Sequence, residues 1–182
     1  MTTSAFGRAI VTAALSTAFV PASAAATWSI IVLGRKTGFI GAAAASCVSD
    51  LHGIMALFPG TGALVAQAMV HPPAMREAIN LLRAGVAPDS VLQTITSSTF
   101  DSASHDRQYG MATFAGGQIQ HTGSALRAYR GERSAEDVLV QGGLLTGPAV
   151  LDRALQAIQR ARAAGQPLED VLMAGLKAGA DA

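Results

Sequence analysis

The sequence has little cysteine, almost no charge imbalance and no apolar segment long enough to cross a membrane. Its single cysteine, Cys47, excludes an intramolecular disulfide framework, and no Cys/His spacing matches a zinc site. Lysine and arginine number 13 against 12 aspartate and glutamate residues. This balance gives no basic surface for nucleic acid or an anionic membrane, so we expect no nucleic-acid partner. Because the Cys/His spacing matches no zinc site, we also expect no metal, and we expect no cofactor.

The first 26 residues differ in character from the rest of the chain. Arg8 precedes an apolar, charge-free stretch at 9–20, which is followed by small residues at 22–26. This pattern is typical of a signal peptide, and the apolar stretch of about 12 residues is too short to span a bilayer core of about 30 Å. Cleavage after Ala24 and cleavage after Ala26 both satisfy the small-residue rule. An uncleaved amphipathic or anchoring helix is the alternative.

Residues 27–182 are predicted to form one domain, in which groups of strands alternate with pairs of helices. The alanine run 42–45 has helical propensity, but the turn and Gly41 before it favour a packed strand. Grouped strands followed by grouped helices indicate a layered α+β fold. The predicted strands are 28–33, 39–46, 63–70, 108–114, 118–122 and 137–141, and the predicted helices begin at Pro73, Pro88, Pro148 and Pro167.

Short segments along nearly the whole of 27–182 resemble, in order, the bacterial and archaeal domain of unknown function 1028. The opening hairpin and the segment 140–148 are the most specific of them. Members of this family look like N-terminal-nucleophile (Ntn) hydrolases, so the resemblance implies a four-layer αββα sandwich. The matching segments are 27–32 with 38–46, 67–68, 81–85, 107–110, 121–123 and 140–148.

The chain departs from the family pattern in two places. Family members typically continue past the last helix into further strands, whereas this chain stops at Ala182. We therefore expect the C-terminal strands to be missing or supplied by a partner. Gly143 stands where the family usually has asparagine, which removes a side-chain amide that could help to bind substrate.

Thr27 is the candidate nucleophile implied by the resemblance. An Ntn hydrolase uses a threonine, serine or cysteine that processing has made N-terminal, because its free α-amino group then acts as the base for its own side chain. The pKa of an α-amino group is about 7.7–8.0, so a useful fraction is neutral near working pH. Cleavage after Ala26 would create this terminus, whereas cleavage after Ala24 would leave two residues ahead of Thr27. An ordinary strand-opening threonine is the alternative.

Other polar residues are assigned weaker roles. Ser46 ends the second strand and would orient the amine of Thr27 if the opening hairpin pairs closely; a small residue that ends a packed strand is the alternative. Gln141, or backbone N–H groups near Gly60 or Gly142, could stabilise an oxyanion.

Three further residues lie in segments that resemble the family. Arg107 and Gln108 could bind a substrate carboxylate, and His121 could line the cleft. A structural ion pair for Arg107 and a strand end for His121 are the alternatives. The loop residue Asp50 resembles an acidic group of the fold class, and Cys47 with His52 would form a nucleophile and base only if the loop brought them together.

These expectations give two functions of different classes. The first is an exported Ntn-type amidohydrolase, periplasmic or secreted and without a stable membrane anchor after processing, acting on an amide in a peptide, a cell-wall fragment or a small metabolite. The second is a non-catalytic binding or scaffold protein with the same fold. In both we expect a homo-oligomer, and in the second the subunits would complete each other's sheets.

Overall fold

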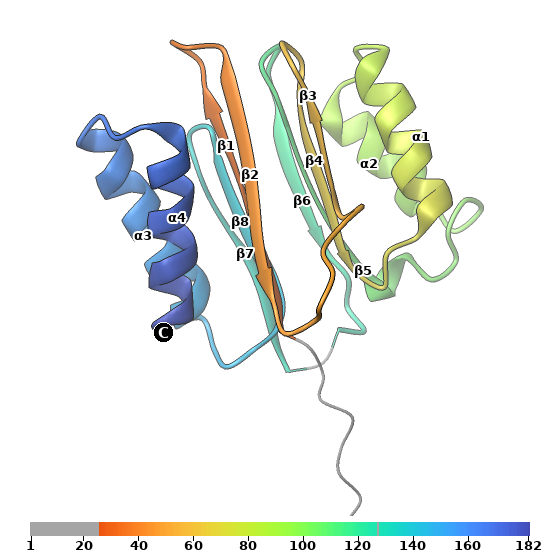
Figure 1. The fold of residues 1–182 in the computed structure, drawn as a ribbon. Helices are drawn as coiled ribbons and strands as arrows, with labels where there is room; N and C mark the ends of the chain where they lie inside the picture. Colours follow the sequence, from red (N-terminus) through yellow and green to blue (C-terminus); the bar gives the residue numbers. More distant parts are fainter. Residues whose placement is uncertain (1–25, 127) are drawn as a thin grey trace, which may run out of the picture.

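The computed structural model describes residues 26–126 and 128–182, and these form two groups of strands and two pairs of helices (Figure 1). The strands are β1 (Thr27–Gly34), β2 (Phe39–Ser46), β3 (Met55–Phe58), β4 (Gly62–Ala68), β5 (Arg107–Thr113), β6 (Gln118–Thr122), β7 (Tyr129–Ala135) and β8 (Val138–Leu145). The helices are α1 (Pro72–Arg83), α2 (Pro88–Thr96), α3 (Ala149–Ala163) and α4 (Leu168–Ala180), with a short 3₁₀ helix at Ser104–Asp106. The predicted mixed α+β class is confirmed.

The strands form two antiparallel sheets, one in the order β2-β1-β8-β7 and the other in the order β3-β4-β5-β6. In the first sheet, Thr27 lies opposite Ser46 of β2 and Gly143 of β8. In the second sheet, Gln67 of β4 lies opposite Gln108 of β5. These pairs bring the ends of five strands together at the lower end of the molecule in Figure 1.

The central strands bury both faces, because successive side chains of a strand point to opposite sides of the sheet. In β1, Ile31 and Leu33 belong to the core between the two sheets, whereas Ile30 and Val32 pack in a second core with α3 and α4. Val65 of β4 belongs to the same inter-sheet core. Burial on both faces explains why β1 and β4 are almost uninterrupted apolar runs.

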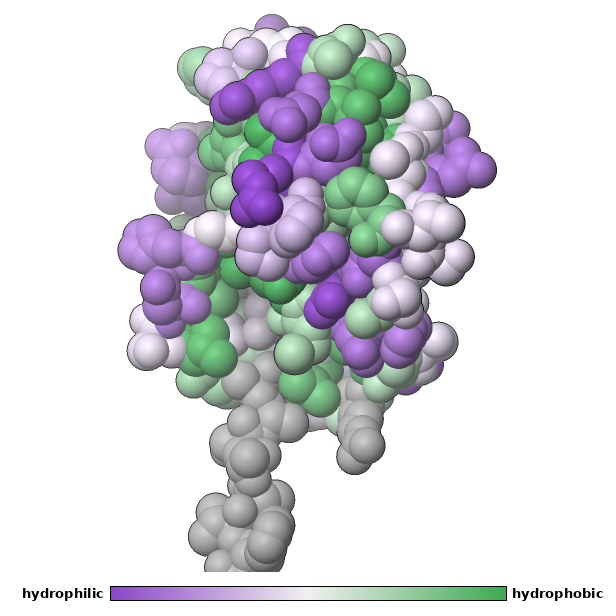
Figure 2. All heavy atoms as spheres, turned by 90° about the vertical axis from the view of Figure 1, so that its right-hand side faces the viewer, coloured by the Kyte–Doolittle hydropathy of each residue, from purple (hydrophilic) through white to green (hydrophobic). Residues whose placement is uncertain are grey.

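The helices cover the outer faces of the sheets in pairs. Helices α3 and α4 pack against β1, β2 and β8, and α1 and α2 pack against β4 and β5 (Figure 1). Hydrophilic residues are spread over the outer surface on the α1 and α2 side (Figure 2). Gly85 and Gly165 follow α1 and α3 with φ of 80° and 70°, a left-handed conformation that ends a helix at low cost in glycine.

Local sequence signals predicted most of these elements correctly. The opening hairpin, the strand formed by the alanine run, the hairpin of β5 and β6, and all four helices are confirmed. Strands β3 and β7 were not predicted. Strand β3 has only four residues, and β7 is a polar edge strand with the sequence YRGERSA, so neither shows the apolar alternation that identifies a strand.

Two predicted strand ends were wrong. The last strand continues beyond the predicted 137–141 through two glycines to Leu145, because its pairing with β1 extends to Gly143. The predicted strand 63–70 ends earlier, at Ala68, whose φ of 67° turns the chain out of the extended conformation.

The close approach of β4 and β5 at Gly62 gives a stability prediction. A Cβ atom at this position would lie 2.9 Å from both Cα and Cγ2 of Thr113 and closer still to the carbonyl oxygen of Ala112. Because backbone atoms cannot move aside, we expect Gly62→Ala to lower the free energy of unfolding by about 1–3 kcal/mol. Urea denaturation would measure this loss.

Gly147 provides the matched control for that substitution. A Cβ atom at Gly147 would meet no atom within 4 Å, and its φ is not positive. We therefore expect Gly147→Ala to change the unfolding free energy by less than about 0.5 kcal/mol. Equal stabilities of the two variants would contradict the close contact at Gly62.

The predicted signal peptide, 1–26, lies outside the described residues except for Ala26. Among the residues that the structure does describe, none of the helices combines the length and the apolar character needed to cross a bilayer.

Candidate active site at the start of the first strand

The space between the sheets changes from apolar to polar toward the lower end of the molecule. The inner face of β1 carries Leu33 and Ile31 in the inter-sheet core and continues, by alternation, with Ser29 and Thr27. In β4 the inner position nearest this end is Gln67, which is 2% exposed. Burying polar groups is unfavourable unless they are hydrogen-bonded, so this polar cluster at the end of an apolar core is the candidate functional site.

Thr27 and Ser46 form the centre of this region. The Oγ1 atom of Thr27 lies 2.7 Å from Oγ of Ser46. The Ser46 hydroxyl also donates to the carbonyl oxygen of Ala26 at 3.0 Å. A hydroxyl has a single proton, so the proton of the Thr27 hydroxyl is the one that points to Ser46. Ser46 therefore contacts both sides of the Ala26–Thr27 peptide bond.

Two buried glutamines connect the two sheets behind Thr27. The Nε2 group of Gln67 donates to the carbonyl oxygen of Thr27 at 3.2 Å and to Oε1 of Gln108 at 2.6 Å. Gln108, which is fully buried, donates in turn to Oγ1 of Thr122 and to the carbonyl oxygen of Gly142. This network fixes the start of β1 against the second sheet.

A pocket of about 400 Å³ opens beside Thr27. It lies between the loop after β2 and the segment after β4, and most of its walls are apolar. A smaller cavity of about 30 Å³ adjoins Thr27 and is also lined by Gln67, Gln108 and Gly143. A volume of that size holds a water molecule, and the lining offers polar partners for it.

The backbone is unusual at two residues that line both cavities. Ala68 and Leu144 have φ values of 67° and 59°, in the left-handed region that non-glycine residues seldom adopt. Each such residue costs of order 1 kcal/mol or more, and these conformations concentrate at functional sites. They redirect the ends of β4 and β8 around Thr27.

The structure brings some of the predicted site residues together and separates others. Ser46 and Gln108 lie beside Thr27 or in its network. Gln141 is buried between the sheets beside Gly110, and neither atom of its side-chain amide has a hydrogen-bond partner among the described residues. A Cβ atom added to Gly142 would contact Trp28 and Leu145, on the helix side of the sheet.

Arg107 is held in a structural arrangement next to the site. Its Nε atom lies 3.0 Å from Oδ2 of Asp101, and its Nη1 atom donates to the carbonyl oxygen of Met69. The carboxylate of Asp101 is buried, and the Arg107 guanidinium holds the pKa of this group below its ordinary value. His71 adds a ring nitrogen 3.4 Å from the same carboxylate.

His121 lies on the helix side of the second sheet. Its Nε2 atom is 3.2 Å from the carbonyl oxygen of Ser104, and its ring stands 6.2 Å from the ring of Tyr109. Burial raises the pKa of Tyr109 to about 12, so this phenol stays protonated at neutral pH. His121 does not line the pockets beside Thr27.

The loop after β2 gives Cys47 no histidine partner. Cys47 is exposed, and its backbone N–H donates to the carbonyl oxygen of Ala26. His52 instead bonds to Asp50: its backbone N–H and its Nδ1 atom each lie 2.7 Å from Oδ1 of that residue. These bonds, led by the one from the backbone N–H, hold the pKa of Asp50 below its ordinary value.

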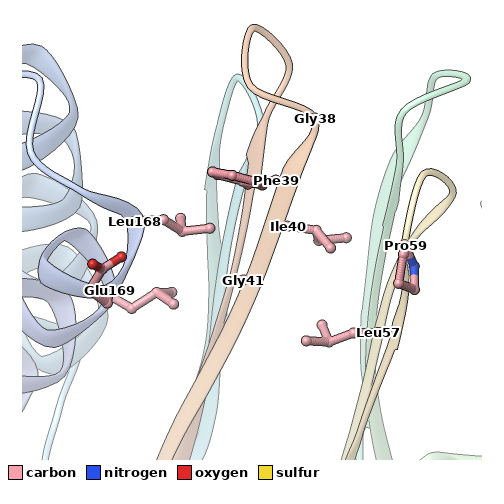
Figure 3. A pocket seen from close by; sticks show the side chains of 9 residues that line it. Gly38, Phe39, Ile40, Gly41, Leu57, Pro59, Leu168 and Glu169 are labelled. Atoms are coloured by element: carbon pink, nitrogen blue, oxygen red, sulfur yellow. The ribbon is translucent and has the colours of Figure 1, made fainter.

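A second, apolar pocket of about 490 Å³ lies at the opposite end of the sheets (Figure 3). Phe39 and Ile40 of β2 and Leu57 of β3 line it together with Leu168 of α4, and Phe39 and Leu57 are largely exposed. Gly60 belongs to the turn after β3 at this end, so its N–H cannot serve as an oxyanion donor for Thr27. No threonine or serine side chain lines this pocket.

Two residues of the site received no role from the sequence. Gln67 is inside a segment that resembles the family, but the resemblance predicts no role for its side chain. Its position two residues after Val65, on the inner face of an apolar strand, is the signal that identifies it. Gly143 was noted only for its missing amide, and the structure places it opposite Thr27.

No group of three or more histidine, cysteine, aspartate or glutamate residues that could bind a metal occurs in the described part of the chain. The polar groups found around Thr27 are the Ser46 hydroxyl, the amides of Gln67 and Gln108, and the Asp50 carboxylate on the wall of the pocket.

The fold and site define a mixed α+β protein with two facing antiparallel sheets and a buried polar cluster at one end. Its residues 27–182 match the model of a family of unknown function, DUF1028, and the chain belongs to that family. A crystal structure of the DUF1028 protein SPO2555 from Silicibacter pomeroyi has a similar fold, with a TM-score of 0.75 and 24% sequence identity. The match covers 86% of this chain and 68% of that one. A comparison with curated protein sequences found no match.

Proposed function

We propose that this chain is an exported amidohydrolase of the Ntn type, with the αββα sandwich of that class and with Thr27 as its nucleophile. The observation that carries the proposal is the hydrogen bond between the Thr27 hydroxyl and Ser46 at the wall of a ligand-sized pocket. Both strands that frame this bond are fixed by the register of the opening hairpin.

The proposed base is the α-amino group that cleavage after Ala26 would create. Asp50 is the one ionisable side chain among the described residues that line the pocket, and it is exposed and bonded to His52. An α-amino group with a pKa of about 7.7–8.0 is a better base at neutral pH than such a carboxylate. Loss of the Ala26 carbonyl would also release the Ser46 hydroxyl, and its oxygen would then position the new amine by accepting from an amine N–H, which leaves the nitrogen lone pair for the Thr27 proton.

The reaction follows from these groups. The amine takes the proton of the Thr27 hydroxyl as Oγ1 attacks the amide carbon, and the same proton passes to the leaving nitrogen when the C–N bond breaks. Water then attacks the resulting ester and gives one proton to the terminal amine; the Oγ1–C bond breaks, the carboxylic acid is released, and the proton taken from the water passes to Oγ1 of Thr27. The small cavity beside Gln67 and Gln108 is a suitable place for this water.

Mapping of the mature N terminus tests the proposal. We expect mass spectrometry of the protein isolated from cells that export it to show a chain that begins at Thr27. A chain that keeps Ala25 and Ala26 would carry its amine two residues away from the hydroxyl and would overturn the mechanism.

A matched pair of purified chains would show whether hydrolysis requires the amino terminus to be on Thr27. One begins at Thr27 and the other at Ala25, and both contain every residue of the described sheets and helices. With a panel of acyl amides as substrates, we expect amide hydrolysis from the first chain only. Equal rates from the two would show that the terminal amine is not the base.

A binding or scaffold protein is the second candidate, and the apolar pocket in Figure 3 favours it. Strands β2 and β3 are edge strands of their sheets, and Phe39 and Leu57 are exposed on them. Unpaired edges with apolar side chains are suited to association with another copy. A monomer that hydrolyses amides would exclude this alternative.

A further inference from the structure

We propose that the pocket beside Thr27 binds an uncharged, apolar acyl group, so that the substrates are amides of aliphatic or aromatic acids. This inference rests on the proposed function, since it assigns the acyl side of the amide that Thr27 would attack. It concerns recognition, and its test below can fail or succeed independently of the chemistry.

The walls of the pocket carry the inference. Leu51 and Ile54 come from the loop after β2, Val70 from the segment after β4, and Leu126 and Leu144 from the residues around β7 and β8. All five are partly buried, so they present apolar surface to the pocket. At about 400 Å³ the pocket is near the lower end of the range for small-molecule sites, about 300–1,000 Å³.

The position of Thr27 decides which half of the amide occupies the pocket. The acyl group remains attached to Oγ1 until water releases it, whereas the amine must leave first and be replaced by water. The group held against the apolar walls beside Thr27 is therefore the acyl group. The small cavity lined by Gln67 and Gln108 adjoins the same residue, and the amide groups of these glutamines offer partners for the water.

The charge of the pocket lining narrows the class of acyl groups that the pocket would accept. Asp50 is the one charged side chain that the described lining contains, and its depressed pKa keeps it ionised at neutral pH. No lysine or arginine lines the pocket. An acyl group with a second carboxylate would face repulsion from Asp50 and would find no partner, so dicarboxylic acyl groups are disfavoured.

Three amides of the same polar amine would test this recognition: octanoyl, acetyl and glutaryl glycinamide. Calorimetry with the full-length Thr27→Ala chain measures their binding without turnover. Each buried methylene group gives about a fourfold gain in affinity, so we expect octanoyl glycinamide to bind at least about a hundredfold more tightly than acetyl glycinamide. We expect no measurable binding of glutaryl glycinamide.

A matched pair of surface variants locates the site. Val48 lines the pocket and is 47% exposed, and Met173 of α4 is 60% exposed and lies elsewhere. In the Thr27→Ala background we expect Val48→Asp to weaken octanoyl glycinamide binding by about tenfold or more, and Met173→Asp to leave it unchanged. Circular dichroism would confirm that both variants are folded.

The outcomes separate recognition from chemistry. Equal binding of the octanoyl and acetyl compounds, or tight binding that Val48→Asp does not weaken, would overturn the assignment of the pocket. In a further outcome, octanoyl glycinamide passes both binding tests while the chain that begins at Thr27 releases no glycinamide. That result would support the assignment of the pocket to an acyl group and contradict the proposed hydrolysis.

Discussion

Replacement of Thr27 by alanine should abolish amide hydrolysis while the fold is retained. The substitution removes the attacking oxygen, and loss of a nucleophile of this kind lowers kcat by about 10⁴-fold or more. The hydroxyl contributes one hydrogen bond to Ser46, so we expect the free energy of unfolding to change by about 1 kcal/mol or less. Release of amine from octanoyl glycinamide and urea denaturation would measure the two effects.

Two further variants show whether the loss is chemical. Thr27→Ser keeps an attacking oxygen on the same amine, so part of the turnover should remain. Ser46→Ala removes the positioning hydroxyl but neither the nucleophile nor the base, and a smaller loss of about 10- to 100-fold is expected. Full activity in Thr27→Ala would place the reaction on another residue.

Replacement of Arg107 by methionine should destabilise the fold by about 3–5 kcal/mol at pH 7, because it leaves a buried carboxylate without its cation. Asp101 is 5% exposed and accepts from the guanidinium of Arg107. Methionine preserves most of the apolar part of the arginine side chain, so the loss of unfolding free energy comes mainly from the missing charge. Urea denaturation monitored by circular dichroism would measure it.

The exposed pair formed by Lys177 and Asp181 is the control for that experiment. Their side chains are 77% and 61% exposed, and solvent screens such a pair, so Lys177→Met should leave the free energy of unfolding nearly unchanged. An Arg107→Met variant that is as stable as the wild type but has a raised KM would instead assign Arg107 to substrate binding.

The loss of unfolding free energy caused by Arg107→Met should also depend on pH. The ion pair holds the pKa of Asp101 below its ordinary value of 3.8, so the folded state binds a proton less readily than the unfolded state. The stability from this pair is therefore present above about pH 4 and is lost as the pH falls through the lower, folded-state pKa. The stabilities of the wild type and Arg107→Met should converge in that acidic range.

The sequence by itself determined the elements that depend on neighbouring residues. Proline at the start of each helix, the 3.6-residue apolar period and the glycine-containing turns are local signals, and they placed the four helices and the two predicted hairpins, β1–β2 and β5–β6, correctly. The same hairpin register placed Ser46 opposite Thr27, 19 residues apart, because a short turn fixes the pairing of its two strands.

Only the tertiary structure decided how the two sheets meet. Gln67 of the second sheet reaches Thr27 of the first across 40 residues of sequence, and Gln108 reaches Gly142 across 34, through contacts between sheets that no local pattern encodes. The same packing turned Gln141 into the interior. Side-chain alternation tells which residues of a strand share a face, but the partner of that face depends on the packing of whole sheets, which involves the entire chain.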